Sequence, residues 1–278
     1  MTTLHDKAAL FNSLHRTGNA LVLANAWDVV SARLIEEAGA AAIATTSAGV
    51  AWALGAPDGD KLDRDRAIDL IARVASAVEV PVTADIESGF ADKPEGVGET
   101  VRGVLEAGAV GVNIEDSTDD ASAPLRPVEE QAARLAAARE AADAMNVPLF
   151  INARVDVFIR AVGDPADRLR TALDRAAAYL AAGASGVFVP AVTDPQTVSA
   201  LVQGVDGPLN ILAGPGAPSI GELSALGVAR VSIGSSIAVA SYAFARRAAQ
   251  EVLGAGTYES LASDIGYRDI NALLSDRN

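Results

Sequence analysis

Residues 81–115 read PVTADIESGFADKPEGVGETVRGVLEAGAVGVNIE, and this stretch contains a strand, a helix and a second strand in turn. The short apolar runs at 81–85 and 110–115 are typical of buried strands. The segment 95–107 has helical periodicity and is followed by Gly108, where a C-terminal cap belongs. Because two strands joined through a helix run parallel, the stretch predicts a βαβ unit.

Outward from this stretch, the same unit recurs along the chain. Further short runs rich in Val and Ile lie at 20–24, 41–45, 148–153, 186–190, 208–213 and 229–233. Helical patterns lie at 28–37, 63–78, 127–145, 165–182, 194–203, 219–226 and 235–253. Eight strands alternating with eight helices predict a closed (β/α)8 TIM barrel, an α/β fold. No linker-like segment divides the chain, so we expect one domain over residues 1–278.

The segment after the last predicted unit is a separate feature. We expect residues 257–278 to form one additional amphipathic helix. Its apolar side contains Leu261, Ile265, Ile270 and Leu273. This C-terminal helix covers either the chain's own barrel or the barrel of a neighbouring subunit.

The composition limits the partners. Half of the residues are hydrophobic, which is enough for a sizeable core. The 22 Lys and Arg against 36 Asp and Glu give a net charge of −14, and the basic residues are scattered, so we expect no nucleic acid or anionic membrane as partner. We find neither a membrane-spanning apolar run of about 20 residues nor a targeting segment, and we expect a cytoplasmic protein.

The residue types that are missing narrow the chemistry further. The chain has no Cys, which excludes thiol nucleophiles and Cys-based metal sites. Its histidines, His5 and His15, precede the first predicted strand, which disfavours a histidine-centred triad or metal site. A Schiff-base aldolase needs a Lys at the end of a strand, and Lys93 is the only conceivable candidate.

Acidic residues gather where the predicted strands end. Asp85, Glu87 and Glu115 follow two of the strands, and Asp58 lies in the loop after another. Barrel enzymes place catalytic groups at these carboxyl ends. Converging carboxylates repel one another unless a cation offsets them. We therefore expect Mg²⁺, with Mn²⁺ as a second candidate, bound directly by Asp85 and through waters by Asp58, Glu87 and Glu115.

A second set of residues is suited to the substrate. Arg154 follows the fifth strand, and its planar guanidinium matches a pair of carboxylate or phosphonate oxygens. Alternatively, Arg154 forms an Arg–Asp pair that only closes the top of the barrel. Backbone amides at Thr45, Thr46 and Ser47 could hold an anionic group, although a plain tight turn would look similar. We add Asn210 as a substrate-binding candidate, and count Arg154, Glu115 and Asp58 as catalytic candidates.

The segment 116–126, DSTDDASAPLR, is long and polar for a loop between a strand and a helix. Its position above the acids predicts a lid that becomes ordered when substrate binds. The alternative is a solvated acidic loop.

In combination, these motifs resemble the isocitrate lyase and phosphoenolpyruvate mutase superfamily over nearly the whole barrel. The matching segments are TTS at 45–47, LGAPD at 54–58, DIESGF at 85–90, NIED at 113–116 and NAR at 152–154. The resemblance implies that Asp85 binds Mg²⁺, that Arg154 contacts substrate and that residues 45–47 bind a substrate carboxylate. It also implies a homo-oligomer, a tetramer or dimer, in which the C-terminal helix is exchanged between subunits.

The resemblance implies an Mg²⁺-dependent lyase that cleaves a C–C or P–C bond of a small α-oxo or 2-hydroxy acid through an enolate. Glu87 stands where the superfamily has Asp, and the 116–126 segment lacks the Cys of the lyases and the Asn of the mutases. These departures disfavour isocitrate or methylisocitrate cleavage and mutase activity. Alternative hypotheses for the function are an oxaloacetate or phosphonopyruvate hydrolase or decarboxylase, a phosphoenolpyruvate mutase-like enzyme, and an inactive metabolite-binding barrel.

Overall fold

The computed structural model describes residues 3–275 and contains a nearly closed barrel of parallel strands. The strands are β1 (Leu21–Leu23), β2 (Asn25–Ala26), β3 (Ile43–Thr45), β4 (Val82–Asp85), β5 (Gly111–Glu115), β6 (Phe150–Arg154), β7 (Gly186–Val189), β8 (Leu209–Leu212) and β9 (Arg230–Ser232). Each pairs in parallel with its neighbour in the order β1-β9-β8-β7-β6-β5-β4-β3-β2. The predicted (β/α)8 fold is therefore confirmed.

The barrel closes through residues 21–26, whereas we predicted one strand at 20–24. In the structure Ala24 interrupts this segment, so that β1 pairs with β9 and β2 pairs with β3. A barrel strand must meet its two neighbours at different heights because the strands are tilted and staggered. The break at Ala24 lets one short segment satisfy both edges.

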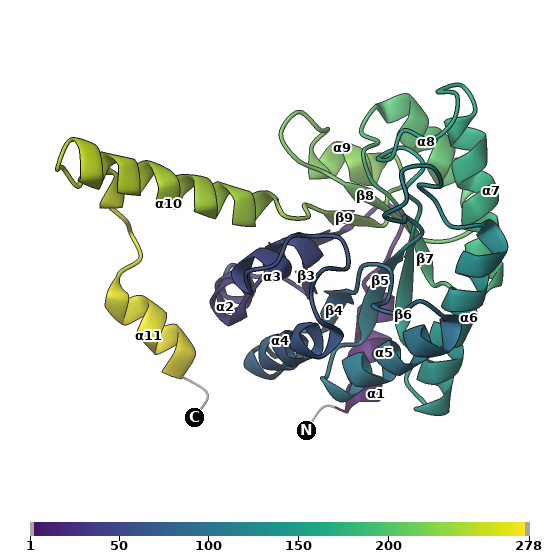
Figure 1. The fold of residues 1–278 in the computed structure, drawn as a ribbon, viewed down its shortest axis with the longest axis horizontal. Coiled ribbons are helices and arrows are strands. Elements are labelled where there is room, and N and C mark those ends of the chain that lie inside the picture. The colour runs from purple at the N-terminus through teal and green to yellow at the C-terminus, as the bar shows by residue number, and fades with distance from the viewer. Residues whose placement is uncertain (1–2, 276–278) are drawn as a thin grey trace.

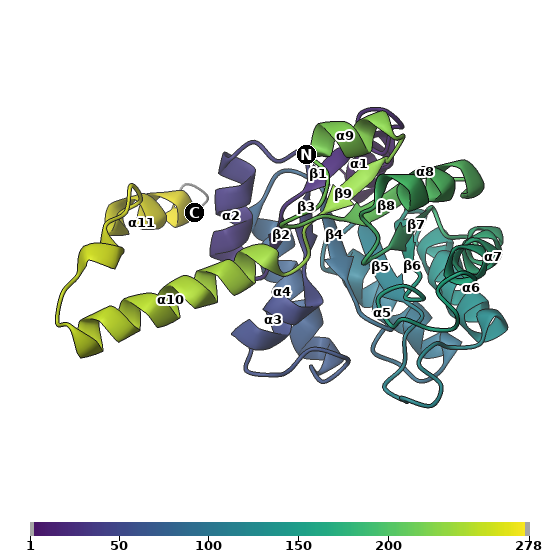
Figure 2. The same cartoon turned by 90° about the horizontal axis from the view of Figure 1, so that it is seen from above.

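Helices surround the barrel, as Figures 1 and 2 show. The predicted helices are α2 (Val29–Glu37), α4 (Arg64–Ala77), α5 (Pro94–Glu106), α6 (Val128–Ala144), α7 (Arg168–Ala181), α8 (Pro195–Gly204), α9 (Ile220–Ala225) and α10 (Ser236–Gly254). Two further helices, α1 (Leu4–Ser13) and α3 (Ser47–Ala53), were not predicted. Residues 45–49 therefore lead into a helix, and the alternative of a plain turn is wrong.

Helix α1 closes the amino-terminal end of the barrel. Thr3 and Asp6 form a capping box that starts the helix. The fully buried ring of Phe11 packs edge-on against Phe150, with 5.7 Å between ring centroids. Gly111 makes this approach possible, because a Cβ there would lie 2.7 Å from both Phe11 and Thr83. Helix α1 thus packs against the amino-terminal ends of β5 and β6.

The C-terminal region leaves the barrel. Helix α10 extends away from the strands, and the chain then turns through η1 (Glu259–Leu261) into α11 (Tyr267–Ser275) (Figure 1). Helix α11 returns to α2, where Arg33 Nε donates to the Leu273 carbonyl at 3.1 Å. The single helix expected over 257–278 is thus two helical segments, separated by residues 262–266. Residues 276–278 of that prediction lie outside the described part.

Within residues 3–275, we find no helix that combines the length and the apolar character required to cross a membrane.

Candidate active site

A cavity of about 180 Å³ opens at the carboxyl ends of the strands. Its walls combine residues from most of the strands with the loops that follow them. The predicted site residues that line it are Thr45, Thr46, Ser47, Asp58, Asp85, Arg154 and Asn210. Glu115 lines a neighbouring hollow under the 116–126 segment. The structure therefore brings the sequence candidates together at one end of the barrel.

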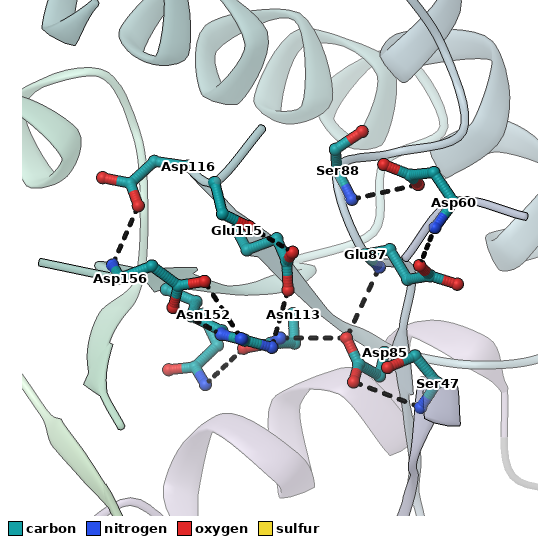
Figure 3. Close-up of polar contacts among 12 residues, drawn as sticks. Ser47, Asp60, Asp85, Glu87, Ser88, Asn113, Glu115, Asp116, Asn152 and Asp156 are labelled. Carbon is teal, nitrogen blue, oxygen red and sulfur yellow. Dashed lines mark hydrogen bonds and ion pairs between the residues drawn. The ribbon is translucent and has the colours of Figure 1, made fainter. Parts of the chain in front are cut away.

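The carboxylate of Asp85 is held in place by three donors at the end of β4 (Figure 3). Oδ2 accepts from the Ser47 backbone N–H at 3.2 Å. Oδ1 accepts from Asn113 Nδ2 at 3.0 Å and from the Glu87 N–H at 3.4 Å. The Asp85 N–H in turn donates to Thr45 Oγ1 at 2.9 Å. This carboxylate therefore has a fixed position in the cavity wall.

Two further acids lie near Asp85. Burial raises the pKa of Asp58, and the charge of Asp85 raises it further. Burial also raises the pKa of Glu87 to about 8, and the charges of Asp60, Asp85 and Asp58 add to this effect. Glu87 is 2% exposed and has a φ of 51°, and its carboxylate accepts from the Asp60 N–H. A nearby cation would favour the charged forms of both groups.

Arg154 is clamped between two carboxylates. Nη1 lies 2.6 Å from Glu115 Oε2, while Nε and Nη2 contact Asp156 at 2.6 and 3.0 Å. Burial alone would lower the pKa of Arg154, but Glu115, Asp156 and Asp85 raise it. A guanidinium has five N–H donors, and these contacts use three, so two remain for a ligand.

The Arg–Asp pair at the top of the barrel is therefore present, and Arg154 also lines the cavity. Contact between Arg154 and a substrate stays a prediction. Burial raises the pKa of Glu115 to about 7, and Arg154 opposes that shift. The Asp156 backbone N–H donates to Asp116 Oδ1 at 2.8 Å. This hydrogen bond connects Asp156, which contacts Arg154, to the fully buried Asp116.

The segment 116–126 folds into a hairpin. Thr118 N–H donates to the Pro124 carbonyl at 3.1 Å, and Arg126 N–H donates to the Asp116 carbonyl at 2.8 Å. Lys61, next to the Asp58 loop, forms an ion pair with Asp119. Residues 119–123 of this hairpin are exposed, so the solvated acidic loop remains an alternative, and movement of the segment when substrate binds stays a prediction.

Several cavity residues were missed by the sequence reasoning. These are Asn25, Thr83, Asn113, Arg230 and Ser232. Side chains at alternate positions of a strand share one face. Thr83 precedes Asp85 by two positions, and Arg230 precedes Ser232 by two, so the alternation of polar residues within apolar strands was the available signal.

The carboxylates fit a cation held largely through water. Among residues 3–275, no three His, Asp or Glu side chains are arranged to hold one metal ion directly. Mg²⁺ keeps several waters and takes one or two carboxylates from a protein. The oxygen-rich set of Asp85, Asp58 and Glu87 consists of the ligand type that such an ion prefers.

Comparison with known proteins places this site in a family. An uncharacterised protein of Mycobacterium tuberculosis is 38% identical over 266 residues, which are 96% of each chain. Oxaloacetate decarboxylase 2 of Pseudomonas fluorescens is 30% identical over 235 residues, covering 82% of this chain and 77% of that enzyme. A Burkholderia cenocepacia structure, provisionally described as a lyase/mutase, is 39% identical with a TM-score of 0.91, covering 98% and 96% of the two chains.

A phosphonopyruvate hydrolase solved with oxalate and Mg²⁺ shares the fold, with a TM-score of 0.83 at 24% identity over 96% of this chain and 94% of the other. The sequence profile described as phosphoenolpyruvate phosphomutase matches residues 11–253. This match spans the barrel and all the candidate site residues. The chain therefore belongs to the phosphoenolpyruvate mutase family, within the isocitrate lyase/phosphoenolpyruvate mutase superfamily of oxo-acid enzymes.

Proposed function

We propose that the protein is an Mg²⁺-dependent lyase that cleaves a C–C or P–C bond of a small α-oxo or 2-hydroxy carboxylic acid. The observation that carries this proposal is the fixed Asp85 carboxylate, which shares a cavity of about 180 Å³ with the clamped Arg154. An anion-binding guanidinium beside an oxygen-rich metal site is suited to an oxo acid. The relative named oxaloacetate decarboxylase supports the same substrate class.

Asp85 would hold Mg²⁺ directly, and Asp58, Glu87 and Glu115 would hold its waters. Mn²⁺ has similar ligand preferences and is the second candidate. When bound, the ion supplies positive charge that stabilises the negative charge developing on the substrate oxygens. The donors that hold Asp85 fix its carboxylate before the ion arrives, so little reorganisation is needed.

The remaining residues orient the substrate. The two N–H groups of Arg154 that face no carboxylate would bind the carboxylate next to the reacting carbon. Residues 45–47, which line the same cavity, would contact the same group, and Asn210 would bind a further oxygen. Ile159 and Phe188 line the same cavity and would help to exclude water.

We also propose that the protein is a homo-oligomer with an exchanged C-terminal region. Val239, Tyr242 and Phe244 on α10 are between 43% and 49% exposed. An apolar groove between β1 and α2 includes Ile237 at the base of the same helix. Because α10 points away from its own barrel (Figure 2), a partner's helix would cover such surfaces.

The test of the proposed reaction uses protein stripped with a chelator and then supplied with Mg²⁺. Release of pyruvate or oxalate is followed with oxaloacetate, phosphonopyruvate, 2-methylisocitrate, isocitrate and dimethylmalate. We expect metal-dependent turnover of at least one acid and its loss in Asp85→Ala. Turnover that persists in the chelator, or that survives Asp85→Ala, would contradict the proposal. Tight acid binding without any turnover would favour the inactive metabolite-binding barrel.

A further inference from the structure

Asp116 lies at the centre of a buried hydrogen-bond network next to the candidate site. It directly follows β5 and is fully buried. Its Oδ1 accepts from the Asp156 backbone N–H at 2.8 Å (Figure 3). Its Oδ2 accepts from Arg175 Nη1 at 2.9 Å and from the Tyr179 hydroxyl at 2.8 Å. The carboxylate therefore joins the end of β5 to the segment after β6 and to α7.

This network holds the chain on both sides of Val155. On one side, the Asp116 backbone N–H donates to the Arg154 carbonyl at 3.2 Å, and on the other its carboxylate accepts from Asp156. The Asp156 carboxylate is almost completely buried and accepts from both Nε and Nη2 of Arg154. Because Asp116 fixes the backbone from which that carboxylate extends, it determines where the partner of the Arg154 guanidinium lies.

Arg175 and Tyr179 are one turn apart on α7 and act on the same carboxylate. The Tyr179 hydroxyl accepts from Arg175 Nη1 at 2.8 Å and donates to Asp116. Burial raises the pKa of Tyr179, and the charge of Asp116 raises it further, so the hydroxyl keeps the proton that it donates. Arg175 Nη1 also donates to the carbonyl of Arg126, the last residue of the hairpin, at 3.0 Å. Helix α7 thus supports Asp116 and the hairpin together.

The cavity is lined by Arg154 but not by Asp116, Arg175 or Tyr179. These three residues can therefore affect a ligand only through the groups that they hold. A buried ion pair such as Arg175 with Asp116 contributes little net stability, because desolvation offsets the attraction between the charges. What it supplies here is a fixed geometry for the segment that carries Arg154.

We propose that Asp116, Arg175 and Tyr179 are positioning residues that hold Arg154 in the orientation in which it binds an anionic ligand. This inference rests on the proposed function, in which Arg154 binds the carboxylate of the substrate. A guanidinium is a rigid planar fork, so a small rotation misaligns its N–H groups with the oxygens of a carboxylate. A defect in the network should therefore weaken anion binding from outside the cavity.

The test measures oxalate binding by calorimetry in the presence of Mg²⁺. Tyr179→Phe keeps the aromatic ring and removes only the hydroxyl that donates to Asp116. We expect this variant to bind oxalate about tenfold more weakly, because the Asp116 carboxylate loses one of its three side-chain and backbone donors and can shift. Mg²⁺ affinity should stay within about threefold, since Asp85 is held by other residues.

A second variant acts on the centre of the network. Asp116→Asn leaves one acceptor oxygen for three donors and should weaken oxalate binding at least as much as Tyr179→Phe does. If Asp116→Asn does not fold, Tyr179→Phe alone decides the matter.

A double-mutant cycle distinguishes positioning from a general loss of stability. Arg154→Lys keeps the charge, so oxalate binding stays measurable, but it cannot form the two-point contact with Asp156. In this background Tyr179→Phe should change oxalate affinity by less than about threefold, because the fork that the network orients is gone.

The matched control is Ser185→Ala, which removes a partly buried hydroxyl just before β7, at the amino-terminal end of the barrel. This hydroxyl accepts from the Ile151 N–H at 3.1 Å. The control should lower the melting temperature and leave oxalate affinity within about twofold.

The inference is wrong if the wild type does not bind oxalate, if Tyr179→Phe binds it as the wild type does, or if Ser185→Ala weakens it equally. A full effect of Tyr179→Phe in the Arg154→Lys background would also overturn it. Its failure is distinguishable from failure of the proposed reaction. If the cycle shows coupling but no acid is cleaved, the network stands and the reaction does not. If Tyr179→Phe retains wild-type kcat/KM on a cleaved acid, the reaction stands and the positioning role falls.

Discussion

The surroundings of His15 predict how the free energy of unfolding changes with pH. His15 stacks on Phe150, with ring centroids 3.7 Å apart, and its Nδ1 contacts the Phe11 carbonyl at 2.9 Å. Burial lowers the pKa of His15 to about 3, and the charge of Arg230 lowers it further. Protonated His15 is therefore strongly disfavoured in the folded protein.

The sign of the pH dependence follows from this shift. Histidine in the unfolded chain titrates near 6.5, so the unfolded chain takes up the proton first as the pH falls. The contribution of neutral His15 to the free energy of unfolding is fully present above about pH 6.5 and is lost progressively toward pH 3. Between pH 7 and pH 5 the loss is about 2 kcal/mol, because each unit below 6.5 costs about 1.4 kcal/mol.

The assay is urea unfolding at pH 7, 6 and 5, at one protein concentration, because the stability of an oligomer depends on concentration. His15→Phe retains an aromatic ring against Phe150 and cannot titrate. Between pH 7 and pH 5, we expect the free energy of unfolding of His15→Phe to fall by about 2 kcal/mol less than that of the wild type. The control His5→Gln removes an exposed histidine from α1 and should follow the wild type. Equal losses in the wild type and His15→Phe would refute the reasoning.

Three further predictions concern the site and the assembly. Asp85→Asn should weaken Mg²⁺ binding at least 100-fold, measured by calorimetry, with an unchanged circular dichroism spectrum; unchanged affinity would exclude Asp85 as a ligand. Arg154→Lys cannot contact Glu115 and Asp156 together through a planar fork, so kcat/KM should fall about 100-fold, or about 2.7 kcal/mol, while Mg²⁺ affinity stays within threefold; an unchanged kcat/KM would remove Arg154 from substrate binding. Phe244→Asp, on the exposed face of α10, should shift the protein toward a smaller species in light scattering, and a monomeric wild type would contradict the exchanged assembly.

The positions of the strands could be predicted because each is a short apolar run at a regular interval. The run at 110–115 became Gly111–Glu115, and the run at 81–85 became Val82–Asp85. In a parallel barrel, all strands end at the same end of the barrel, so the polar residues that follow them gather there. Asp85 and Arg154 could therefore be placed in one cavity before any contact was known.

Other features depend on contacts between distant residues. The break at Ala24 arises from closure of the ring, which no local pattern records. Helix α1 is short, and its signal was the capping pair Thr3 and Asp6 rather than a strong apolar face. Arg230 was hidden inside an apolar strand, and only the structure shows that it lines the cavity with Nε and Nη1 buried without a hydrogen-bond partner among residues 3–275. Helix α10 also extends away from the barrel (Figure 1), a direction that its helical pattern does not record.

The most direct test of the metal-dependent site is a crystal structure of the protein with Mg²⁺ and oxalate. We expect one ion bound directly by an Asp85 oxygen, with Asp58, Glu87 and Glu115 contacting its waters. Oxalate should lie against this ion, within hydrogen-bond distance of Arg154. An ion bound away from Asp85, or oxalate bound without any ion in the cavity, would contradict the proposed metal site.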